Sequence, residues 1–382
     1  MLHKGTRNIL ISFIIIIFSS LNVFSFNEKN DDPVINNETN SKPFSKKNIK
    51  DGPYIFYENG NFLVKWIKNN KSFQREVKDN NFKFVERKFG LKLNSNDILE
   101  KINATPDYTQ TFSGIENLIA ISDIHGQYET FVRLLISNKV IDKNLNWIFG
   151  NGHLVVLGDL MDRGPKVTES LWFVYQLEKK AKISGGKVHV LLGNHELMVL
   201  NNDTRYINNK YQETSKLFLT SYSKLFSENT ILGNWLRKKP AMVKINDILF
   251  VHAGISLELV RKEISIEKAN KLFINQITGK SWDIILNDSL LTFMMGDYGP
   301  VWYRGYFDLP VLHEYKIDFI TNYFDVNHIV VGHTSFSNII SIYNNKILGI
   351  DSSIKLGNYG EVLIYKNKMF YRGTLSGSLI EL

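Results

Sequence analysis

The segment from Leu118 to Met198 constrains the fold more than any other part of the chain. It contains three apolar, β-rich runs, "LIAISDIHGQ", "HLVVLGDLMDRG" and "KVHVLLGNHE", and a helical pattern lies between each run and the next. The order strand, helix, strand, helix, strand is typical of an α/β fold with a largely parallel sheet. Ligands of such sheets bind beyond the carboxyl ends of the strands. The polar residues that close each run are therefore predicted to meet in one site.

Five predicted strand ends carry side chains of the kind that bind metals. Two later strand patterns, "ILFVHAG" and "NHIVVGH", end in histidines in the same way as the three runs above end in acidic, Asn and His residues. Together these ligands exceed what one ion needs and suit two divalent ions, with Asp159 as the candidate bridge. Carboxylate, amide and imidazole ligands without thiolate favour Mn, Fe or Zn. The candidate ligands are Asp123, His125, Asp159, Asn194, His252 and His333.

The residues beside these ligands predict the reaction. Two ions a few Å apart lower the pKa of a bridging water and hold the attacking and leaving oxygens of a displacement at phosphorus. His195 can then protonate the leaving alkoxide, while Asp162 orients its ring and raises its pKa. Arg163 can hold two phosphoryl oxygens with its planar guanidinium. Hydrolysis of phosphate esters by a metal-bridging hydroxide, with His195 as the general acid, is the predicted activity.

The first residues of the chain predict targeting to the secretory pathway. Lys4 and Arg7 precede an apolar run over residues 9–18, and this pattern over residues 1–25 is typical of a signal peptide. Its destination is the endoplasmic reticulum or the exterior in a eukaryote, and the periplasm in a bacterium. The alternative is an uncleaved membrane anchor. Residues 26–49 are polar and are interpreted as a linker.

The rest of the chain divides into two predicted domains. Residues 50–112 are expected to form a small β-rich N-terminal module, with a hairpin around Asn59-Gly60, that packs against the catalytic domain. Residues 113–382 are expected to form the catalytic domain, with a helical cap inserted at 201–239. Residues 259–292 have the pattern of an amphipathic helix.

Composition narrows the range of partners. The chain has 46 basic and 38 acidic residues, a net charge of +8, but no basic run is interleaved with aromatic residues. This distribution argues against nucleic acid as a partner. No stable membrane partner is expected. The expected partner is the substrate, either a phosphorylated protein or a small phosphoester.

Five short blocks of this sequence resemble those of the calcineurin-like metallophosphoesterase superfamily, and they occur in the same order. The second block, with its D-R-G ending, is similar to the phosphoprotein phosphatase branch, which also contains bacterial diadenosine tetraphosphatases. Within that branch, "DGPY", "NNDTRYINNKY" and "GPVWYRGY" resemble the Shewanella-like protein phosphatases. The resemblance implies a four-layer αββα sandwich. The blocks are D-x-H-G (123–126), GDLMDRG (158–164), GNHE (193–196), HAG (252–254) and GH (332–333).

The resemblance also implies a role for each residue of the site. The first metal would be bound by Asp123, His125 and Asp159, and the second by Asp159, Asn194, His252 and His333. The phosphoryl group would be bound by Arg163, Arg304 and Asn194, and His195 with Asp162 would be the general acid pair. Eukaryotic serine/threonine phosphatases carry a loop like "SAPNYC" where this chain has "GIDSS" (349–353). The resemblance therefore assigns no preference among substrates.

Several functions stay open on the sequence alone. The leading prediction is hydrolysis of phosphate monoesters on phosphoproteins, with serine/threonine and tyrosine both open. The alternative is hydrolysis of dinucleoside polyphosphates such as diadenosine tetraphosphate, for which the cap would shape the nucleoside pocket. A non-catalytic scaffold would be expected to have lost a ligand, and none is lost. Four aromatic residues near Arg304 either line a pocket for an aryl phosphate or serve packing: Trp302, Tyr303, Tyr306 and Phe307.

Overall fold

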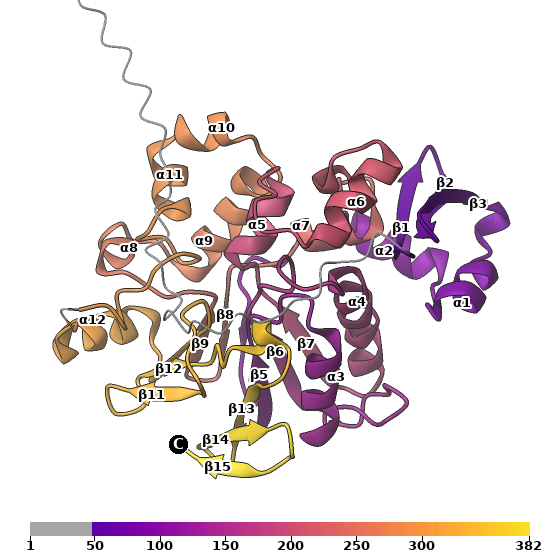
Figure 1. Cartoon of the computed structure of the whole chain (residues 1–382). Helices are drawn as coiled ribbons and strands as arrows, with labels where there is room; N and C mark the ends of the chain where they lie inside the picture. The colour runs from indigo at the N-terminus through magenta and orange to yellow at the C-terminus, as the bar shows by residue number, and fades with distance from the viewer. Residues whose placement is uncertain (1–47, 310) are drawn as a thin grey trace, which may run out of the picture. The chain divides into compact units, whose positions relative to one another are not determined.

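The computed structural model describes residues 48–309 and 311–382 (Figure 1). The predicted signal peptide at 1–25 and nearly all of the predicted linker at 26–49 lie outside the described residues. Within the described part of the chain, no helix is both long and apolar enough to cross a lipid bilayer.

An antiparallel sheet of three strands opens the described chain, in the order β1-β2-β3. Asn59 and Gly60 join the first two strands with positive φ of 50° and 83°, which is the turn geometry that matches the twist of a hairpin. The hairpin predicted around these two residues is confirmed, and a second turn at Asn69-Asn70 adds a third strand. The elements are β1 (Lys50–Glu58), β2 (Asn61–Lys68), β3 (Lys71–Val77), α1 (Lys83–Phe89) and α2 (Ser95–Asn103).

The three apolar runs of the sequence form neighbouring strands of a six-stranded sheet. β5, β6 and β7 are parallel, as predicted, and α3 (Tyr128–Ser137) and α4 (Val167–Ile183) lie between them in sequence. The C-terminal strands complete the sheet. β13 pairs antiparallel with β5, β14 with β13, and β15 with β14. The strand order is β15 (Leu379–Glu381), β14 (Met369–Thr374), β13 (Glu361–Lys366), β5 (Asn117–Ile121), β6 (His153–Val156), β7 (Lys187–Val190).

A second six-stranded sheet holds the two later histidine-bearing strands. β9 and β10 are parallel neighbours, so their carboxyl ends lie at the same edge. β8 pairs antiparallel with β9, because the two-residue turn at Asn246-Asp247 permits only a hairpin. The strand order is β11 (Ile340–Ile342), β12 (Ile347–Gly349), β10 (His328–Val331), β9 (Ile248–Val251), β8 (Met242–Ile245), β4 (Thr111–Phe112).

The two sheets pack face to face. Ala120 and Val155 of the first sheet and Phe250 and Val330 of the second belong to one buried apolar cluster. The outer face of the first sheet packs with α3 and α4, and that of the second packs with α8 to α12. The layers are therefore helix, sheet, sheet and helix, as the predicted αββα sandwich requires. Both sheets are mixed, however: parallel pairing joins β5, β6 and β7 in the first sheet, and joins β9 to β10, β10 to β12 and β4 to β8 in the second, while the other pairs are antiparallel.

The prediction of one amphipathic helix over residues 259–292 is wrong. Glu263 and Gly279 have positive φ, 51° and 76°, and a right-handed helix cannot continue through that conformation. The region is divided into α8 (Leu257–Arg261), α9 (Ile266–Leu272), α10 (Trp282–Leu286) and α11 (Ser289–Met295).

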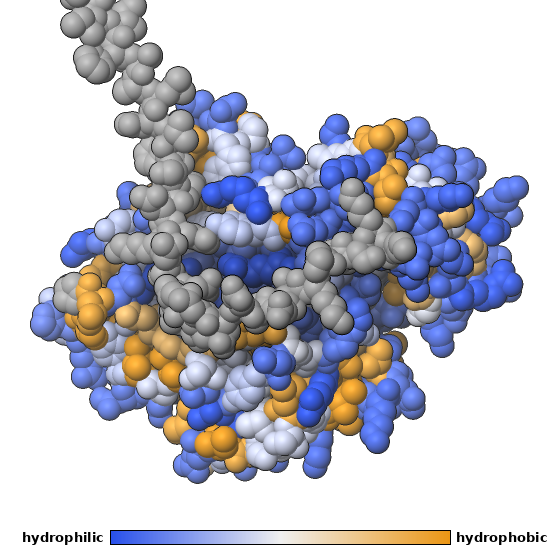
Figure 2. Space-filling view, in the orientation of Figure 1, coloured by the Kyte–Doolittle hydropathy of each residue, from blue (hydrophilic) through white to orange (hydrophobic). Residues whose placement is uncertain are grey.

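The remaining helices are α5, α6 and α7, together with α12 on the outer face of the second sheet. Residues 201–239, the segment predicted to be a helical cap, contain α6, α7 and a 3-10 helix between them. On the face drawn in Figure 2, exposed hydrophobic residues lie in separate patches among hydrophilic ones. The elements are α5 (Asn194–Leu200), α6 (Asn209–Phe218), the 3-10 helix Tyr222–Phe226, α7 (Ile231–Arg237) and α12 (Glu314–Phe324).

Candidate functional site

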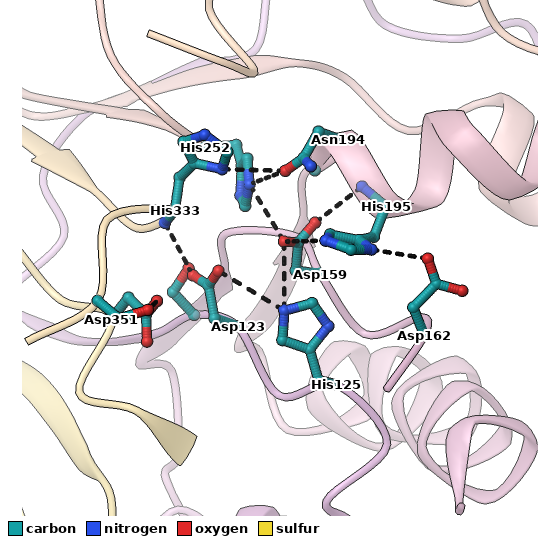
Figure 3. Close-up of polar contacts among 12 residues, drawn as sticks. Asp123, His125, Asp159, Asp162, Asn194, His195, His252, His333 and Asp351 are labelled. Atoms are coloured by element: carbon teal, nitrogen blue, oxygen red, sulfur yellow. Dashed lines mark hydrogen bonds and ion pairs between the residues drawn. The ribbon is translucent and has the colours of Figure 1, made fainter. Parts of the chain in front are cut away.

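Asp159 occupies the centre of a buried polar cluster at the carboxyl ends of the strands (Figure 3). Its Oδ2 lies 3.5 Å from His125 Nε2 and 3.4 Å from His252 Nε2, which come from different sheets. Its Oδ1 accepts a hydrogen bond of 3.1 Å from the backbone N–H of His195. The side chains of this cluster are nearly inaccessible to solvent. The strand ends therefore meet as the sequence predicts.

Two histidines turn nitrogen lone pairs into this cluster. His125 donates its Nδ1–H to the carbonyl of Met161 at 2.8 Å, and His252 donates its Nδ1–H to the carbonyl of Leu157 at 2.7 Å. Because a carbonyl only accepts, the Nε2 atom of each ring is an acceptor when the ring is neutral, and both Nε2 atoms face Asp159. Burial lowers the pKa of His125, whereas for His252 the effect of burial is outweighed by Asp159, which raises the pKa to about 9. Either a proton on Nε2 or a bound cation can therefore satisfy the carboxylate of Asp159. The arrangement fits a bound metal ion.

The potential metal ligands form two groups that share Asp159. One contains His125, Asp159 and His195, and the other contains Asp159, His252 and His333. The Oδ1 of Asn194 joins the second group, at 2.8 Å from His252 Nε2 and 3.0 Å from His333 Nδ1. Asp159 thus stands where a bridging ligand is expected.

Asp123 lies at the edge of the first group. Its Oδ1 is 4.0 Å from His125 Nε2, and its Oδ2 accepts hydrogen bonds from the Ser122 hydroxyl and, at 3.0 Å, from the backbone N–H of His333. Burial, together with Asp351 and Asp159, raises the pKa of Asp123 to about 8. The site therefore concentrates negative charge that a cation would stabilise.

His195 and Asp162, which the sequence predicts to be a general acid pair, lie within hydrogen-bond distance of each other. His195 Nδ1 lies 2.6 Å from Asp162 Oδ2, and both residues are buried. The carboxylate accepts this hydrogen bond, so Nε2 is the atom that faces Asp159, at 4.0 Å. Burial lowers the pKa of His195, but Asp159 and Asp162 outweigh it and raise the pKa above its ordinary value. A protonated ring pointing into the cluster is favoured.

The two predicted arginines flank the cluster. The guanidinium of Arg163 lies over the ring of Tyr206, with its Cζ 5.5 Å from the ring centroid, and that ring meets His195 edge to face at 5.3 Å. Arg304 donates from Nη1 to the carbonyl of His333 at 3.2 Å. Arg163 is therefore on the side of the acid pair, and Arg304 is on the side of His333.

The aromatic loop around Arg304 mainly serves packing. Tyr303 and Tyr306 are buried in the core of the second sheet, and the Tyr306 hydroxyl bonds to Ile255. Phe307 packs on Phe336. Trp302 is the exception, because its ring meets His333 edge to face at 5.6 Å.

Glu196 is a site residue that the sequence analysis did not assign. Its fully buried carboxylate accepts four backbone N–H bonds of 2.7 to 3.0 Å, from Asp159, Leu160, Met161 and Gly193. These bonds fix the loop after β6 against the start of α5. The available signal was its place three residues after Gly193, where an acidic residue caps a helix.

Asp351 was also missed. It is buried near Asp123, and its carboxylate accepts hydrogen bonds from the Ser335 hydroxyl and from the Ser353 backbone N–H, the latter at 2.9 Å. Ser335 follows His333 by two residues. Asp351 therefore fixes the loop that carries His333, and the carbonyl of His333 accepts the hydrogen bond from Arg304.

Much of the site has a left-handed backbone. This region is sparsely populated by residues other than glycine, and it concentrates at functional sites. Close contact between the loops accompanies it, since a Cβ on Gly158 would lie 2.3 Å from the backbone N of Gly193. The site residues with positive φ are Asp123 (53°), His125 (45°), Asp159 (55°), Asp162 (67°), Arg163 (60°) and His333 (64°).

Comparison with known proteins agrees with this fold and site. The family model described as calcineurin-like phosphoesterase matches residues 117–335, which span every one of the predicted site residues. The chain belongs to this family of metal-dependent phosphoesterases. The donor set of the site fits the divalent metal ions that the family implies.

Within the family, the similarity to the Shewanella-like protein phosphatases extends over most of the chain. The crystal structure of a cold-active protein-tyrosine phosphatase of a psychrophilic Shewanella species is 40% identical, covers 87% of this chain and 99% of its own, and has a TM-score of 0.81. The Shewanella-like protein phosphatase 1 of Plasmodium berghei is 30% identical over 288 residues, which are 70% of this chain and 76% of that protein.

Similarity to a nucleotide hydrolase is more limited. A symmetrical bis(5'-nucleosyl)-tetraphosphatase of Buchnera aphidicola is 30% identical over 172 residues, which are 44% of this chain and 54% of that protein.

Proposed function

We propose that this chain hydrolyses phosphate monoesters of phosphoproteins with two divalent metal ions. The observation that carries the proposal is the position of His195, which is hydrogen-bonded to Asp162 on one side and faces Asp159 on the other. A protonated ring beside a cluster of metal ligands is what the departure of an ester oxygen requires. The relatives named as protein phosphatases support the same conclusion.

The metal ions would share the buried donors of the site. When bound, they would supply an activated water and neutralise the charge of the phosphoryl group. Mn, Fe or Zn suits nitrogen and oxygen donors of this kind. We assign Asp123, His125 and Asp159 to the first ion, and Asp159, Asn194, His252 and His333 to the second.

The chain's own residues bind the ester and supply the proton. Arg163 and Arg304 hold the phosphoryl oxygens from two sides, assisted by Asn194. His195 donates the Nε2 proton to the leaving oxygen, because its Nδ1–H is held by Asp162. Asp162 also stabilises the positive charge of the ring before the transfer.

The preferred substrate under this proposal is phosphotyrosine. The leaving group must lie beside His195, since that residue protonates it. The half-buried ring of Tyr206 packs against His195 and therefore borders the leaving-group side. An aryl ester would pack on this ring, whereas the short side chain of phosphoserine would not reach as much of it. The tyrosine phosphatase of Shewanella supports this preference.

The direct test is phosphate release from three substrates after Mn, Zn or Fe has been restored. We expect a phosphotyrosine peptide to turn over fastest, followed by a phosphoserine peptide and then by diadenosine tetraphosphate. Tyr206→Leu should raise KM for the phosphotyrosine peptide and leave that for the phosphoserine peptide nearly unchanged. Trp302→Leu, on the His333 side, is the matched control and should not alter the ratio.

Hydrolysis of dinucleoside polyphosphates is the second candidate, and the Buchnera relative favours it. Its similarity covers less than two thirds of either protein. Faster turnover of diadenosine tetraphosphate than of both peptides would establish this candidate and reject the phosphoprotein substrate.

We also propose that residues 1–25 direct the protein into the secretory pathway. Mass analysis of the N-terminus after export in a matching host would identify cleavage. Recovery of the full-length chain in the membrane fraction would favour an uncleaved anchor, and recovery from the cytosol would contradict the proposal.

A further inference from the structure

A buried carboxylate joins the three-stranded sheet to the helices beside the phosphate site. Asp51 of β1 is 3% exposed and is surrounded by four donors. Its Oδ2 accepts from the Tyr54 hydroxyl at 2.7 Å and from the Thr214 hydroxyl at 3.0 Å. Its Oδ1 accepts from the Thr168 hydroxyl at 2.9 Å and lies 3.3 Å from Lys210 Nζ. These partners belong to β1, α4 and α6, so one side chain fastens three elements together.

Lys210 links Asp51 to residues 163–165, the loop that contains Arg163. Its ammonium is almost completely buried and donates to the carbonyl of Pro165 at 2.8 Å. The Tyr211 hydroxyl donates to the same carbonyl at 3.1 Å. A buried ammonium needs a compensating negative charge. Asp51 supplies a buried one at 3.3 Å, and Glu169 supplies a more exposed one at 3.5 Å.

Pro165 lies two residues after Arg163, and the same segment of chain holds Arg163 directly. The backbone N–H of Arg163 donates to the carbonyl of Tyr206 at 2.9 Å, and its carbonyl accepts from Asn208 Nδ2 at 2.8 Å. Residues 206–211 therefore contact the loop at both Arg163 and Pro165. Asp51 contacts the same segment at Lys210.

We propose that Asp51 is a positioning residue for Arg163 and acts through Lys210 and the first turn of α6. The three-stranded sheet is then a part of the phosphate-binding machinery rather than an accessory to it. The inference rests on the proposed function, in which Arg163 binds the phosphoryl group. It assigns a role to the "DGPY" segment, which begins with Asp51.

The test compares Asp51→Asn with Glu178→Gln as a matched control. Glu178 is a paired carboxylate of α4 that bonds to Lys101 and Lys239, away from the Arg163 loop. The readouts are KM for p-nitrophenyl phosphate, the inhibition constant of inorganic phosphate, kcat and the melting temperature. Residues in one polar network are energetically coupled, and a tenfold change in affinity corresponds to about 1.4 kcal/mol. Asp51→Asn should raise KM and the phosphate inhibition constant together by about tenfold.

A double variant tests whether the effect passes through Arg163. In the Arg163→Ala background, Asp51→Asn should change the phosphate inhibition constant by less than about twofold, because the positioned group is gone. The same change in both backgrounds would overturn the inference. So would a lower melting temperature for Asp51→Asn with an unchanged phosphate inhibition constant, which is the result expected for Glu178→Gln.

Two further results separate the remaining possibilities. If Arg163→Ala itself leaves KM and phosphate inhibition unchanged, the role of Arg163 in the proposed function fails, whatever Asp51 does. If Asp51→Asn does not fold, Thr214→Val replaces it, since it removes one donor from the Asp51 carboxylate and keeps every charge. Thr214→Val should weaken phosphate inhibition to a smaller extent, and unchanged inhibition would overturn the inference.

Discussion

Asp162→Asn isolates the contribution of the acid pair, because it removes one charge with almost no change in shape. Asp162 and His195 are both buried, and the bond between them is 2.6 Å long. The variant leaves a protonated His195 without its compensating carboxylate. A positioned general acid contributes about 10²- to 10⁴-fold to the rate. Because Asp162 orients His195 and holds its proton, kcat for an alkyl phosphate should fall about 10²- to 10³-fold in this variant.

The assay is a series of esters whose leaving groups differ in pKa. A phosphoserine peptide depends most on proton donation, a phosphotyrosine peptide depends less, and p-nitrophenyl phosphate depends least. The loss of kcat should follow that order. Asp162 also raises the pKa of His195, so its replacement should lower that pKa. Because the protonated form is required, the alkaline limb of the kcat profile should move to lower pH.

Two results would refute this reasoning. One is an equal loss of kcat on all three esters, and the other is an alkaline limb that does not move. His195→Ala provides the control background, in which Asp162→Asn should add little because the proton donor is already absent.

Three other predictions concern the scaffold of the site. Glu196→Gln places an amide donor against backbone N–H groups, so we expect a loss of about 2–3 kcal/mol in thermal unfolding and a lower bound-metal content. Burial lowers the pKa of His153 to about 4 and holds that of His189 well below 6.5. Both histidines bind protons at higher pH in the unfolded state than in the folded state. The free energy of unfolding should therefore fall as pH drops from 6.5 to about 4. His189→Gln should make this decrease less steep. Gly158→Ala should abolish soluble expression, because its Cβ would lie 2.3 Å from the backbone N of Gly193.

Each of these has a contrary outcome. Glu196→Gln with the parent melting temperature and metal content would remove the role assigned to the four backbone bonds. A His189→Gln protein that loses stability with acid as steeply as its parent would place the titrating groups elsewhere. A soluble, active Gly158→Ala protein would mean that the loops containing Gly158 and Gly193 can separate by the width of a methyl group.

The sequence was sufficient to bring together the candidate metal ligands of the first sheet. Asp123, Asp159 and Asn194 follow short apolar runs, and the alternation of strands with helices places the ends of those runs at one edge of a sheet. His252 and His333 end strands of the other sheet, which the strand pattern alone does not reveal. Their arrival beside Asp159 depends on the stacking of two sheets, and that is a property of the whole core.

The residues that support the ligands could not be predicted in the same way. A local pattern marks Glu196 only as a helix cap beside Gly193, because its other three bonds reach backbone groups some 35 residues earlier in the chain. Asp51 meets Lys210 across more than 150 residues, and no local pattern marks that contact. The prediction of one helix over residues 259–292 failed because of local backbone conformation. The apolar periodicity is real, but Glu263 and Gly279 adopt positive φ, and periodicity carries no information on such breaks.

The left-handed backbone of the ligand residues has a consequence for how such an enzyme can be improved. Each residue other than glycine held in that region stores about 1 kcal/mol of conformational energy. Glycine at Asp123, Asp159 or His333 would release this energy and, under the proposed function, remove a metal ligand in the same step. Selection for heat resistance alone would therefore favour inactive descendants at these positions. Catalysis and thermal tolerance have to be screened together in any library that includes them.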